Sequence, residues 1–317
     1  MWSIKVMQGE SKVSLVGRAW RDCVPPSNGE NAMTQATGTS KASDSIEMQC
    51  DLEGLPPFPA VALQALKLMS GSDTSLIELC NLIRTDPAFS TAVLRIANSP
   101  LVAFSKTVTN VLQASMLLGF RRLKSVVITV GMKAYLQQSS TPLMQSCWQH
   151  SVACAIIAER SASQSAMDKD FAYTAGILHD IGRVALVTLM PKAYARVIER
   201  GADDPQDLLQ VERELCGIDH CQAGHALVTA WSLPKIFLEI ASCHHRQEGH
   251  LPGASGLIPP SCELADSLGF AVVRCRSPRS YAKILATFSE RAQNGFPPEG
   301  KELRSEIEKQ IKVIESA

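Results

Sequence analysis

Residues 173–189, YTAGILHDIGRVALVTL, place a histidine and an aspartate side by side between two apolar segments. An ionisable pair inside such a stretch is costly to bury unless it has partners. Imidazole and carboxylate together are good ligands for a hard or borderline divalent metal. The pair His179–Asp180 therefore predicts a metal site. Two alternatives stay open on the dipeptide alone: a capped helix end, or a buried hydrogen bond between the two side chains.

The composition of the chain favours a helical protein. It has 317 residues, enough for two modest domains or one large domain with tails. With 45% apolar and only 5% aromatic residues, it suits packed helices better than a β-sandwich or barrel. A formal net charge of zero gives no electrostatic argument for nucleic acid or an anionic membrane, and no apolar run approaches transmembrane length. We therefore expect an all-α protein that binds neither nucleic acid nor membrane.

The ten cysteines are scattered along the chain and form no CxxC pair. This spacing excludes a zinc ribbon and a thioredoxin-type motif. The first 22 residues have no continuous apolar segment of the kind found in a signal peptide. In a chain this long without such a signal, the cysteines are typical of reduced, mostly buried thiols, and we expect a cytoplasmic protein.

The pattern of helix formers and breakers predicts a short tail followed by helices. Residues 1–48 are expected to be a disordered N-terminal tail, because 25–44 is rich in Ser, Thr, Gly, Asn and Pro. The β-branched stretch 123–136 could be a strand, but its length and helical neighbours favour a buried helix. Helices are expected over 60–69, 74–83, 88–97, 108–118, 123–136, 143–161, 169–178, 191–200, 207–215, 220–229, 236–245, 260–268, 278–294 and 299–316.

The seven histidines all fall between positions 150 and 250. They lie in predicted helices or at helix ends. Facing helices that project histidine and carboxylate side chains inward are a standard way to build a metal site. The histidines are His150, His179, His220, His225, His244, His245 and His250.

Several motifs together resemble the HD superfamily of metal-dependent phosphohydrolases, and more closely its HDOD branch. They are LPPFPAVALQALKLM, IRTDPAFSTAVLRIANSP and VLQASMLLGFRRLKSVVI within 55–128, WQHS at 148–151, GILHDIGR at 176–183, GIDHCQAGHALVTAWSLP at 217–234 and SCHHR at 242–246. The resemblance covers about residues 50–270. It implies an all-α, HD-superfamily helical bundle with two helical lobes and a cleft between them. It places the HDOD domain at 49–275, with lobes at 49–137 and 140–275 and a C-terminal helical extension at 276–317.

The resemblance also implies a set of metal ligands. One ion would be held by His150, His179, Asp180 and Asp266, and a second by Asp180, His220, His244 and His245. The ions would be divalent, one or two in number, and the spacing does not choose among Fe, Mn, Zn, Ni and Mg. Asp180 and Arg183 would be catalytic, with Arg183 standing where related enzymes often have Lys, near a substrate phosphate. A two-metal site can generate hydroxide and clamp both oxygens of a displacement at phosphorus.

Two departures from the family's enzymes limit the chemistry. Enzymes of the superfamily that open cyclic dinucleotides carry a Gly-Tyr-Pro motif after the paired histidines, whereas this chain has HHRQEGHLPG. Cyclic dinucleotide cleavage is therefore unsupported. Arg183 in place of Lys keeps the charge but changes the geometry of phosphate binding.

Two functions follow from the resemblance. The first is a bacterial-type signal-transduction module that binds a partner protein and carries a divalent metal centre. The alternative is an active metal-dependent phosphohydrolase that acts on a nucleotide or other phosphoester. If the ligands are only remnants, the histidines and Asp180 would instead form a hydrogen-bonded polar core. His225 and His250 have no counterpart in the family pattern, and Arg121, Arg122 and Lys124 are expected on a solvated face.

Overall fold

Helices make up most of the part of the chain that the structure describes. The computed structural model describes residues 2–6, 13–17, 55–68, 75–100, 102, 107–137, 141–164, 167–203, 205–245 and 253–316. It divides the chain into two units, Met1–Gly54 and Leu55–Ala317. Among the described residues, no helix combines the length and the apolar character needed to cross a membrane.

The first unit contains a pair of antiparallel strands. Strand β1 (Trp2–Val6) pairs with β2 (Val13–Gly17), in a register that sets Trp2 opposite Gly17 and Val6 opposite Val13. These ten residues depart from the disordered tail expected over 1–48. The alternation of apolar and polar residues in WSIKV is the pattern that a strand needs, and the compositional argument from 25–44 did not weigh it. The rest of 1–48 lies outside the described residues.

The second unit begins with four helices that follow the predicted start and stop signals. Ser75 forms a capping box with Glu78, and Asp86 caps the next helix with Pro87 at its first position. The long fourth helix is broken at Gly119, whose φ of 74° is open to glycine, so the predicted stop at this residue is confirmed. The stretch 123–136 is helical, as predicted. The helices are α1 (Ala60–Leu68), α2 (Leu76–Arg84), α3 (Pro87–Ala97) and α4 (Val111–Gln137).

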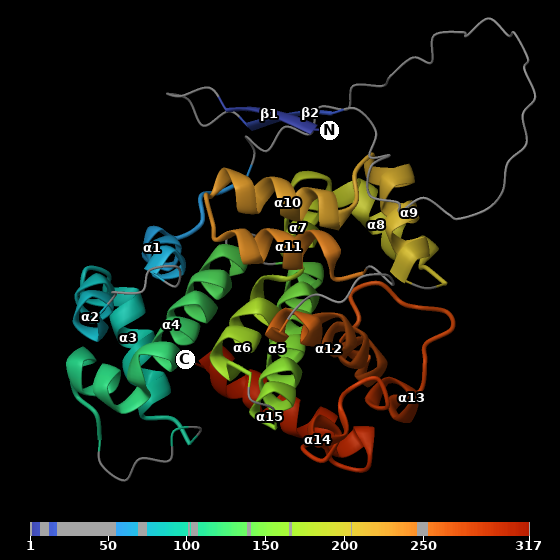
Figure 1. Cartoon of the computed structure of the whole chain (residues 1–317). Coiled ribbons are helices and arrows are strands. Elements are labelled where there is room, and N and C mark those ends of the chain that lie inside the picture. The colour runs from blue at the N-terminus through green and yellow to red at the C-terminus, as the bar shows by residue number, and fades with distance from the viewer. Residues whose placement is uncertain are drawn as a thin grey trace, which may run out of the picture. The chain divides into compact units, whose positions relative to one another are not determined.

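Helix α5 (Pro142–Ser163) runs through the middle of the second unit (Figure 1). Nearly every side chain from Cys147 to Ala158 is buried, and α5 packs against α4 and against most of the helices that follow it. A helix that is apolar on all sides is stable only in such a central position. His150 lies in this buried stretch with no exposed surface.

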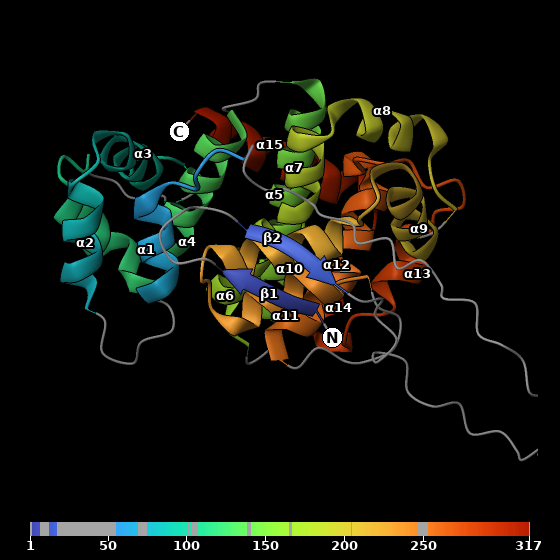
Figure 2. The same ribbon diagram turned by 90° about the horizontal axis from the view of Figure 1, so that it is seen from above.

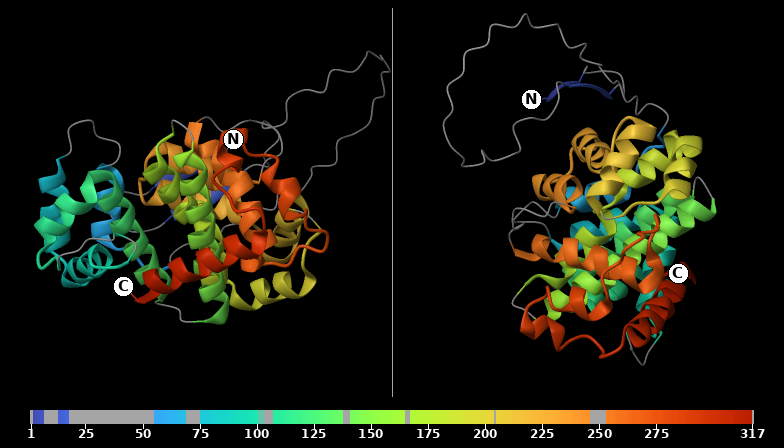
Figure 3. Two further views of the ribbon diagram at one scale, coloured as in Figure 1. Left: turned by 90° about the horizontal axis from the view of Figure 1, so that it is seen from below. Right: turned by 90° about the vertical axis from the view of Figure 1, so that its right-hand side faces the viewer.

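The remaining helices surround α5. Helices α10 and α11 pack side by side on one side of it, and α12 to α15 pack around its other end (Figures 1 and 3). Their bounds are α6 (Lys169–Leu178), α7 (Ile181–Leu189), α8 (Pro191–Arg200), α9 (Pro205–Cys216), α10 (His220–Ala230), α11 (Lys235–Cys243), the 3-10 turn η1 (Gly253–Leu257), α12 (Ile258–Ala265), the π-helical turn η2 (Asp266–Phe270), α13 (Tyr281–Leu285), α14 (Glu290–Gln293) and α15 (Gly300–Ser316).

The single helix predicted over 278–294 is wrong. Two short helices, α13 and α14, replace it. Thr287 donates its hydroxyl to the carbonyl of Ile284, and Ser289 accepts a hydrogen bond from the amide of Ala292. Hydroxyl side chains that bond the nearby backbone in this way end one helix and start the next.

The N-terminal and C-terminal helices of the second unit are joined to its centre by specific contacts. Phe58 packs against Tyr135 of α4 and Trp231 at the end of α10, with ring centroids 5.5 and 4.8 Å apart. Near the same end of α4, Lys133 donates to the backbone carbonyls of Ile314 and Glu315, which secures the end of α15. Helices α1 to α3 lie to one side of α5 in Figure 2, whereas α8 and α9 lie to the other. The division into two lobes with a cleft stays a prediction.

Two glycines allow helices to approach closely where the predicted site residues lie. A Cβ on Gly176 of α6 would lie 2.4 Å from the Cα of Ala155 on α5. A Cβ on Gly182 of α7 would lie 1.9 Å from the carbonyl oxygen of His220 and 2.3 Å from the amide nitrogen of Gly224 on α10. Each distance is shorter than any van der Waals contact, so these two helix pairs can pack this closely only around glycine.

We predict that Gly182→Ala lowers the free energy of unfolding by at least ~3 kcal/mol, because the added methyl group must push α7 away from α10. Urea denaturation followed by circular dichroism measures the change. Gly295→Ala is the matched control. Its Cβ would meet the exposed side chain of Gln164, which can move away, and the expected change is within about 0.5 kcal/mol. Equal effects of the two substitutions would contradict this account.

Candidate metal centre

The predicted ligands come from five places in the chain and converge beside α5. His150 lies on α5, His179 and Asp180 form the junction of α6 and α7, and His220 begins α10. His244 and His245 follow the last turn of α11, and Asp266 begins η2. The side chains of His150, His179, Asp180, His220 and His244 are at most 3% exposed, whereas Asp266 is 32% exposed.

His150 and His179 form the first half of the cluster. Their Nε2 atoms lie 3.2 Å apart, and the Nε2 of His150 lies 3.9 Å from Oδ2 of Asp180. The Nδ1 of His179 lies 2.7 Å from the carbonyl oxygen of Gly176. Because a carbonyl can only accept, Nδ1 carries the proton of the neutral ring and Nε2 keeps its lone pair for the cluster.

His220 and His244 form the second half. Their Nε2 atoms lie 3.3 Å apart, and they lie 3.6 and 3.9 Å from Oδ1 of Asp180. The Nδ1 of His244 faces the carbonyl oxygen of Ile240 at 3.2 Å, which leaves its Nε2 lone pair directed into the cluster. Asp180 therefore lies between two histidine pairs, with one carboxylate oxygen toward each.

Only one oxygen of the buried Asp180 carboxylate has a hydrogen-bond donor. Arg183 donates to Oδ2 at 2.8 Å, whereas the buried Oδ1 makes no hydrogen bond. Burial would raise the pKa of Asp180, but the Arg183 guanidinium and the surrounding imidazoles lower it below its usual range. A buried carboxylate oxygen without a donor is costly. This orphaned oxygen, together with the converging imidazole nitrogens, fits a divalent cation.

His179, His244 and His245 are held in the state that metal binding requires. Burial lowers the pKa of His179 to about 4 and lowers the pKa values of His244 and His245 well below the usual range for histidine. Neutral imidazole is the form that coordinates a metal. His245, the fourth predicted ligand of the second ion, is partly exposed, and its ring centroid lies 4.3 Å from that of His244.

Glu212 and Tyr194 support the second half of the cluster, and the sequence analysis missed both. Oε2 of Glu212 lies 2.5 Å from Nδ1 of His220 and also accepts the His220 backbone amide at 2.9 Å. Its Oε1 accepts the hydroxyl of Tyr194 at 2.7 Å. Burial alone would lower the pKa of His220, but the Glu212 carboxylate outweighs it and raises that pKa well above its usual value. A carboxylate behind a ligand histidine fixes its ring orientation and tautomer.

A signal for Glu212 was present in the sequence. Leu208 and Val211 mark the buried face of α9, and Glu212 follows Leu208 by four residues and so shares that face. A glutamate at a core position of an otherwise polar helix needs a partner. Its partner could not be identified without the fold.

Asp266 and Cys262 flank opposite edges of the His150 ring. Oδ1 of Asp266 lies 3.1 Å from Nδ1, which is the nitrogen turned away from His179. Sγ of Cys262 lies 3.6 Å from Nε2, on the same side as His179. The structure thus brings the predicted ligand Asp266 to His150, but this contact is not on the Nε2 side. It places at Nε2 a cysteine that the sequence analysis did not select.

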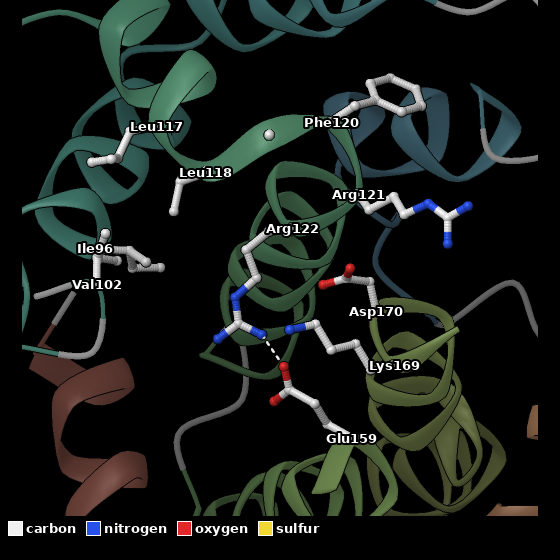
Figure 4. Close-up of a pocket in the computed structure, with 11 residues that line it drawn as sticks. Ile96, Val102, Leu117, Leu118, Phe120, Arg121, Arg122, Glu159, Lys169 and Asp170 are labelled. Carbon is white, nitrogen blue, oxygen red and sulfur yellow. Dashed lines mark hydrogen bonds and ion pairs between the residues drawn. The ribbon is translucent and has the colours of Figure 1, made fainter. Parts of the chain in front are cut away.

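His225 and the basic patch lie away from the cluster. His225 is half-buried, with its Nδ1 3.2 Å from the hydroxyl of Ser242, and His250 lies outside the described residues. Arg121 is exposed and pairs with Asp168, in accord with the solvated face expected for the patch. Arg122 differs, because it pairs with Glu159 in a pocket of about 660 Å³ beside the break at Gly119 (Figure 4).

Comparison with known proteins identifies a family for most of the second unit. The family model of the HDOD domain matches residues 55–247. An uncharacterized protein of Treponema pallidum (strain Nichols) is 24% identical over 212 residues, which are 66% of this chain and 40% of that protein. The chain thus spans less than half the length of this curated relative.

Three solved structures share the fold. The first is an HDOD domain protein of unknown function from Geobacter sulfurreducens, with a TM-score of 0.63 and 23% identity over 83% of this chain and 92% of that one. The second, from Shewanella amazonensis SB2B, is provisionally named a phosphohydrolase and has a TM-score of 0.59 and 22% identity over 83% and 93%. The third, from Marinobacter aquaeolei VT8, is provisionally named a signal transduction protein and has a TM-score of 0.57 and 21% identity over 84% and 59%. At these identities the likeness concerns the fold alone.

We predict that Glu212→Ala lowers the free energy of unfolding of the metal-free protein by about 3–5 kcal/mol, because it leaves a buried imidazole and a buried hydroxyl without their partner. Urea denaturation after chelation measures the change. Glu214→Ala is the matched control on the same helix, since Glu214 forms an exposed ion pair with Arg200, and we expect little change. A Glu212→Ala protein as stable as this control would contradict a supporting role for Glu212.

Proposed function

The chain belongs to the HDOD domain family, and from this premise we propose that it is a regulatory signalling module built around a divalent metal centre. His150, His179 and Asp180 would hold one ion, and Asp180, His220, His244 and His245 a second. The arrangement of two Nε2 pairs on either side of one carboxylate carries the proposal. Imidazole and carboxylate donors suit borderline cations such as Zn, Fe, Mn or Ni.

The burial of the ligands supports a regulatory role over a catalytic one. Structural metal sites are closed by protein ligands, whereas catalytic sites keep a position open for water or substrate. His150, His179 and His220 are at most 1% exposed, and Arg183, the residue expected to meet a substrate phosphate, is 3% exposed. In the described residues, Arg183 already pairs with Asp180. A phosphoester therefore has no free cation to meet at this end of the cluster.

A bound ion would connect parts of the fold that are far apart in the sequence. The proposed ligands come from α5, the junction of α6 and α7, α10 and the end of α11. Coordination would fix these elements relative to one another, because metal binding to a folded site adds directly to its stability. The Marinobacter aquaeolei neighbour carries the provisional name of a signal transduction protein, in line with the signalling role proposed here, and we propose that the module acts on a protein partner.

The second candidate function is a metal-dependent phosphohydrolase that acts on a nucleotide or other phosphoester. The observation in its favour is that the two oxygens of Asp180 face two separate histidine pairs. A carboxylate shared by two ions is the arrangement that clamps the attacking and leaving oxygens in a displacement at phosphorus. In that reaction Asp180 would hold both ions, and Arg183 would have to leave Asp180 to bind phosphate.

We predict that purified protein contains one or two divalent ions per chain and that Asp180→Ala loses them, because Asp180 is the carboxylate shared by both halves of the cluster. Elemental mass spectrometry measures the content. Asp168→Asn is the matched control, since Asp168 caps α6 and asparagine preserves the cap. No bound metal in the wild type, even after anaerobic purification with added Fe or Mn, would overturn the metal centre.

We predict that the metal-loaded protein does not hydrolyse phosphoesters, because His150, His179, His220, His244 and Arg183 are buried. A screen of nucleoside phosphates and p-nitrophenyl phosphate, with each of the candidate metals, checks this expectation. Metal-dependent phosphate release that is lost in His179→Ala but kept in His225→Ala would instead establish the enzyme.

A further inference from the structure

We propose that Cys262 is a direct thiolate ligand at the His150–His179 end of the metal centre, and that Asp266 positions His150 without touching the ion. The inference rests on the metal centre proposed above and specifies its donor set. It replaces the oxygen ligand that the family resemblance implies with a sulfur ligand.

The distances within the cluster match a tetrahedral metal site. The Nε2 atoms of His150 and His179 are 3.2 Å apart, and Sγ of Cys262 is 3.6 Å from Nε2 of His150. All three ligand atoms lie within 4.8 Å of one another. With metal–nitrogen bonds of about 2.05 Å and metal–sulfur bonds of about 2.3 Å, tetrahedral geometry requires N–N and N–S separations of roughly 3.3 and 3.6 Å. The His150–His179 and His150–Cys262 pairs already have this spacing.

Asp266 and Cys262 lie on consecutive turns and contact different nitrogens of the His150 ring. Asp266 lies at Nδ1, and Cys262 lies at Nε2. They are four residues apart, where α12 passes into the π-helical turn η2, so both side chains face α5. The carboxylate oxygen that lies 3.1 Å from Nδ1 of His150 is on the opposite edge from Nε2. A carboxylate at this edge orients a ligand histidine and increases its basicity, which is the usual role of a residue behind the ligand.

The surroundings of Cys262 distinguish it from an ordinary core cysteine. Its side chain is 2% exposed, and its sulfur lies 3.6 Å from an imidazole nitrogen, a polar contact that a buried structural thiol does not need. The buried Oδ1 of Asp180, which makes no hydrogen bond, lies in the same cluster. On coordination the thiol proton would leave to solvent and the thiolate would bind the ion.

A sulfur ligand has a consequence for metal choice. Thiolate favours zinc and iron, whereas all-oxygen sites favour magnesium and manganese. The His150–His179 end of the cluster should therefore select a softer ion than the His220–His244 end. Cys221, whose sulfur lies near His220 and His244, is the competing thiolate and must be tested beside Cys262.

The test is a titration of the full chain, stripped of metal, with Co²⁺ under anaerobic conditions. Visible d–d bands report that a metal site of low coordination number forms, and a near-ultraviolet sulfur-to-cobalt charge-transfer band reports a thiolate ligand. We expect both in the wild type. We expect Cys262→Ser to lose the charge-transfer band, and Cys221→Ser and the control Cys80→Ser on α2 to keep it.

Asp266→Asn separates positioning from ligation. We expect it to keep the charge-transfer band while weakening Co²⁺ affinity about 10–100-fold, the usual cost of losing a partner behind a ligand histidine. Two results together would show that Asp266 is the ligand and Cys262 is not. The wild type would show no charge-transfer band, and Asp266→Asn would bind one ion fewer per chain.

The remaining outcomes are distinguishable from one another. Visible bands without a charge-transfer band in the wild type, or a band that Cys221→Ser removes, would overturn the role of Cys262 and leave the metal centre intact. The absence of all cobalt bands would overturn the metal centre itself. If Cys262→Ser does not fold, zinc-edge X-ray absorption of the wild type decides: we expect one sulfur at about 2.3 Å, and none would refute the inference.

Discussion

A buried carboxylate is the constraint on which this structure depends. Asp180 is 3% exposed, and a charge removed from water to this extent must be matched by partners of opposite charge or by donors. Arg183, three residues along the same helix, supplies one partner for Oδ2. The side of Oδ1 faces imidazoles from α10 and α11, with the Nε2 atoms of His220 and His244 at 3.6 and 3.9 Å. The segments packed beside α5 therefore also supply the polar groups that surround the buried carboxylate of Asp180 in place of water.

Two glycines make this shell geometrically possible. The contact of Gly176 with Ala155 brings α6 against α5, so that His179 reaches His150. The contact of Gly182 with His220 and Gly224 brings α7 against α10, so that Asp180 reaches His220. In both places the residue that permits the approach lies within three residues of the side chain that uses it. The motif GILHDIGR thus carries His179 and Asp180 together with the glycines that let their helices pack closely.

Local signals in the sequence predicted most of the helices and the break at Gly119, because caps, breakers and periodicity act over a few residues. The sequence did not predict the side-chain contacts between helices that lie far apart in the chain, because these contacts depend on the three-dimensional fold. The resemblance transferred Asp266 by its position in the chain, but it could not say that its oxygen would face Nδ1 of His150 while Cys262 took the Nε2 side. Glu212 and Tyr194 were missed for the same reason, since each acts through a partner from another helix. The strand pair at the N-terminus was missed because composition outweighed a short alternating pattern.

Helix α10 has its two ends in different environments. It begins with His220 in the polar cluster and ends at Trp231, which stacks on Phe58 and Tyr135. Its eleven residues span about 16 Å, and a helix of that length moves as a stiff rod. The helix therefore links the polar cluster to an aromatic contact made by Phe58, just before α1, and Tyr135 of α4. In mechanical terms α10 resembles a lever. It rests against α7 where Gly182 meets Gly224, and its far end contacts Phe58, the residue that leads into α1.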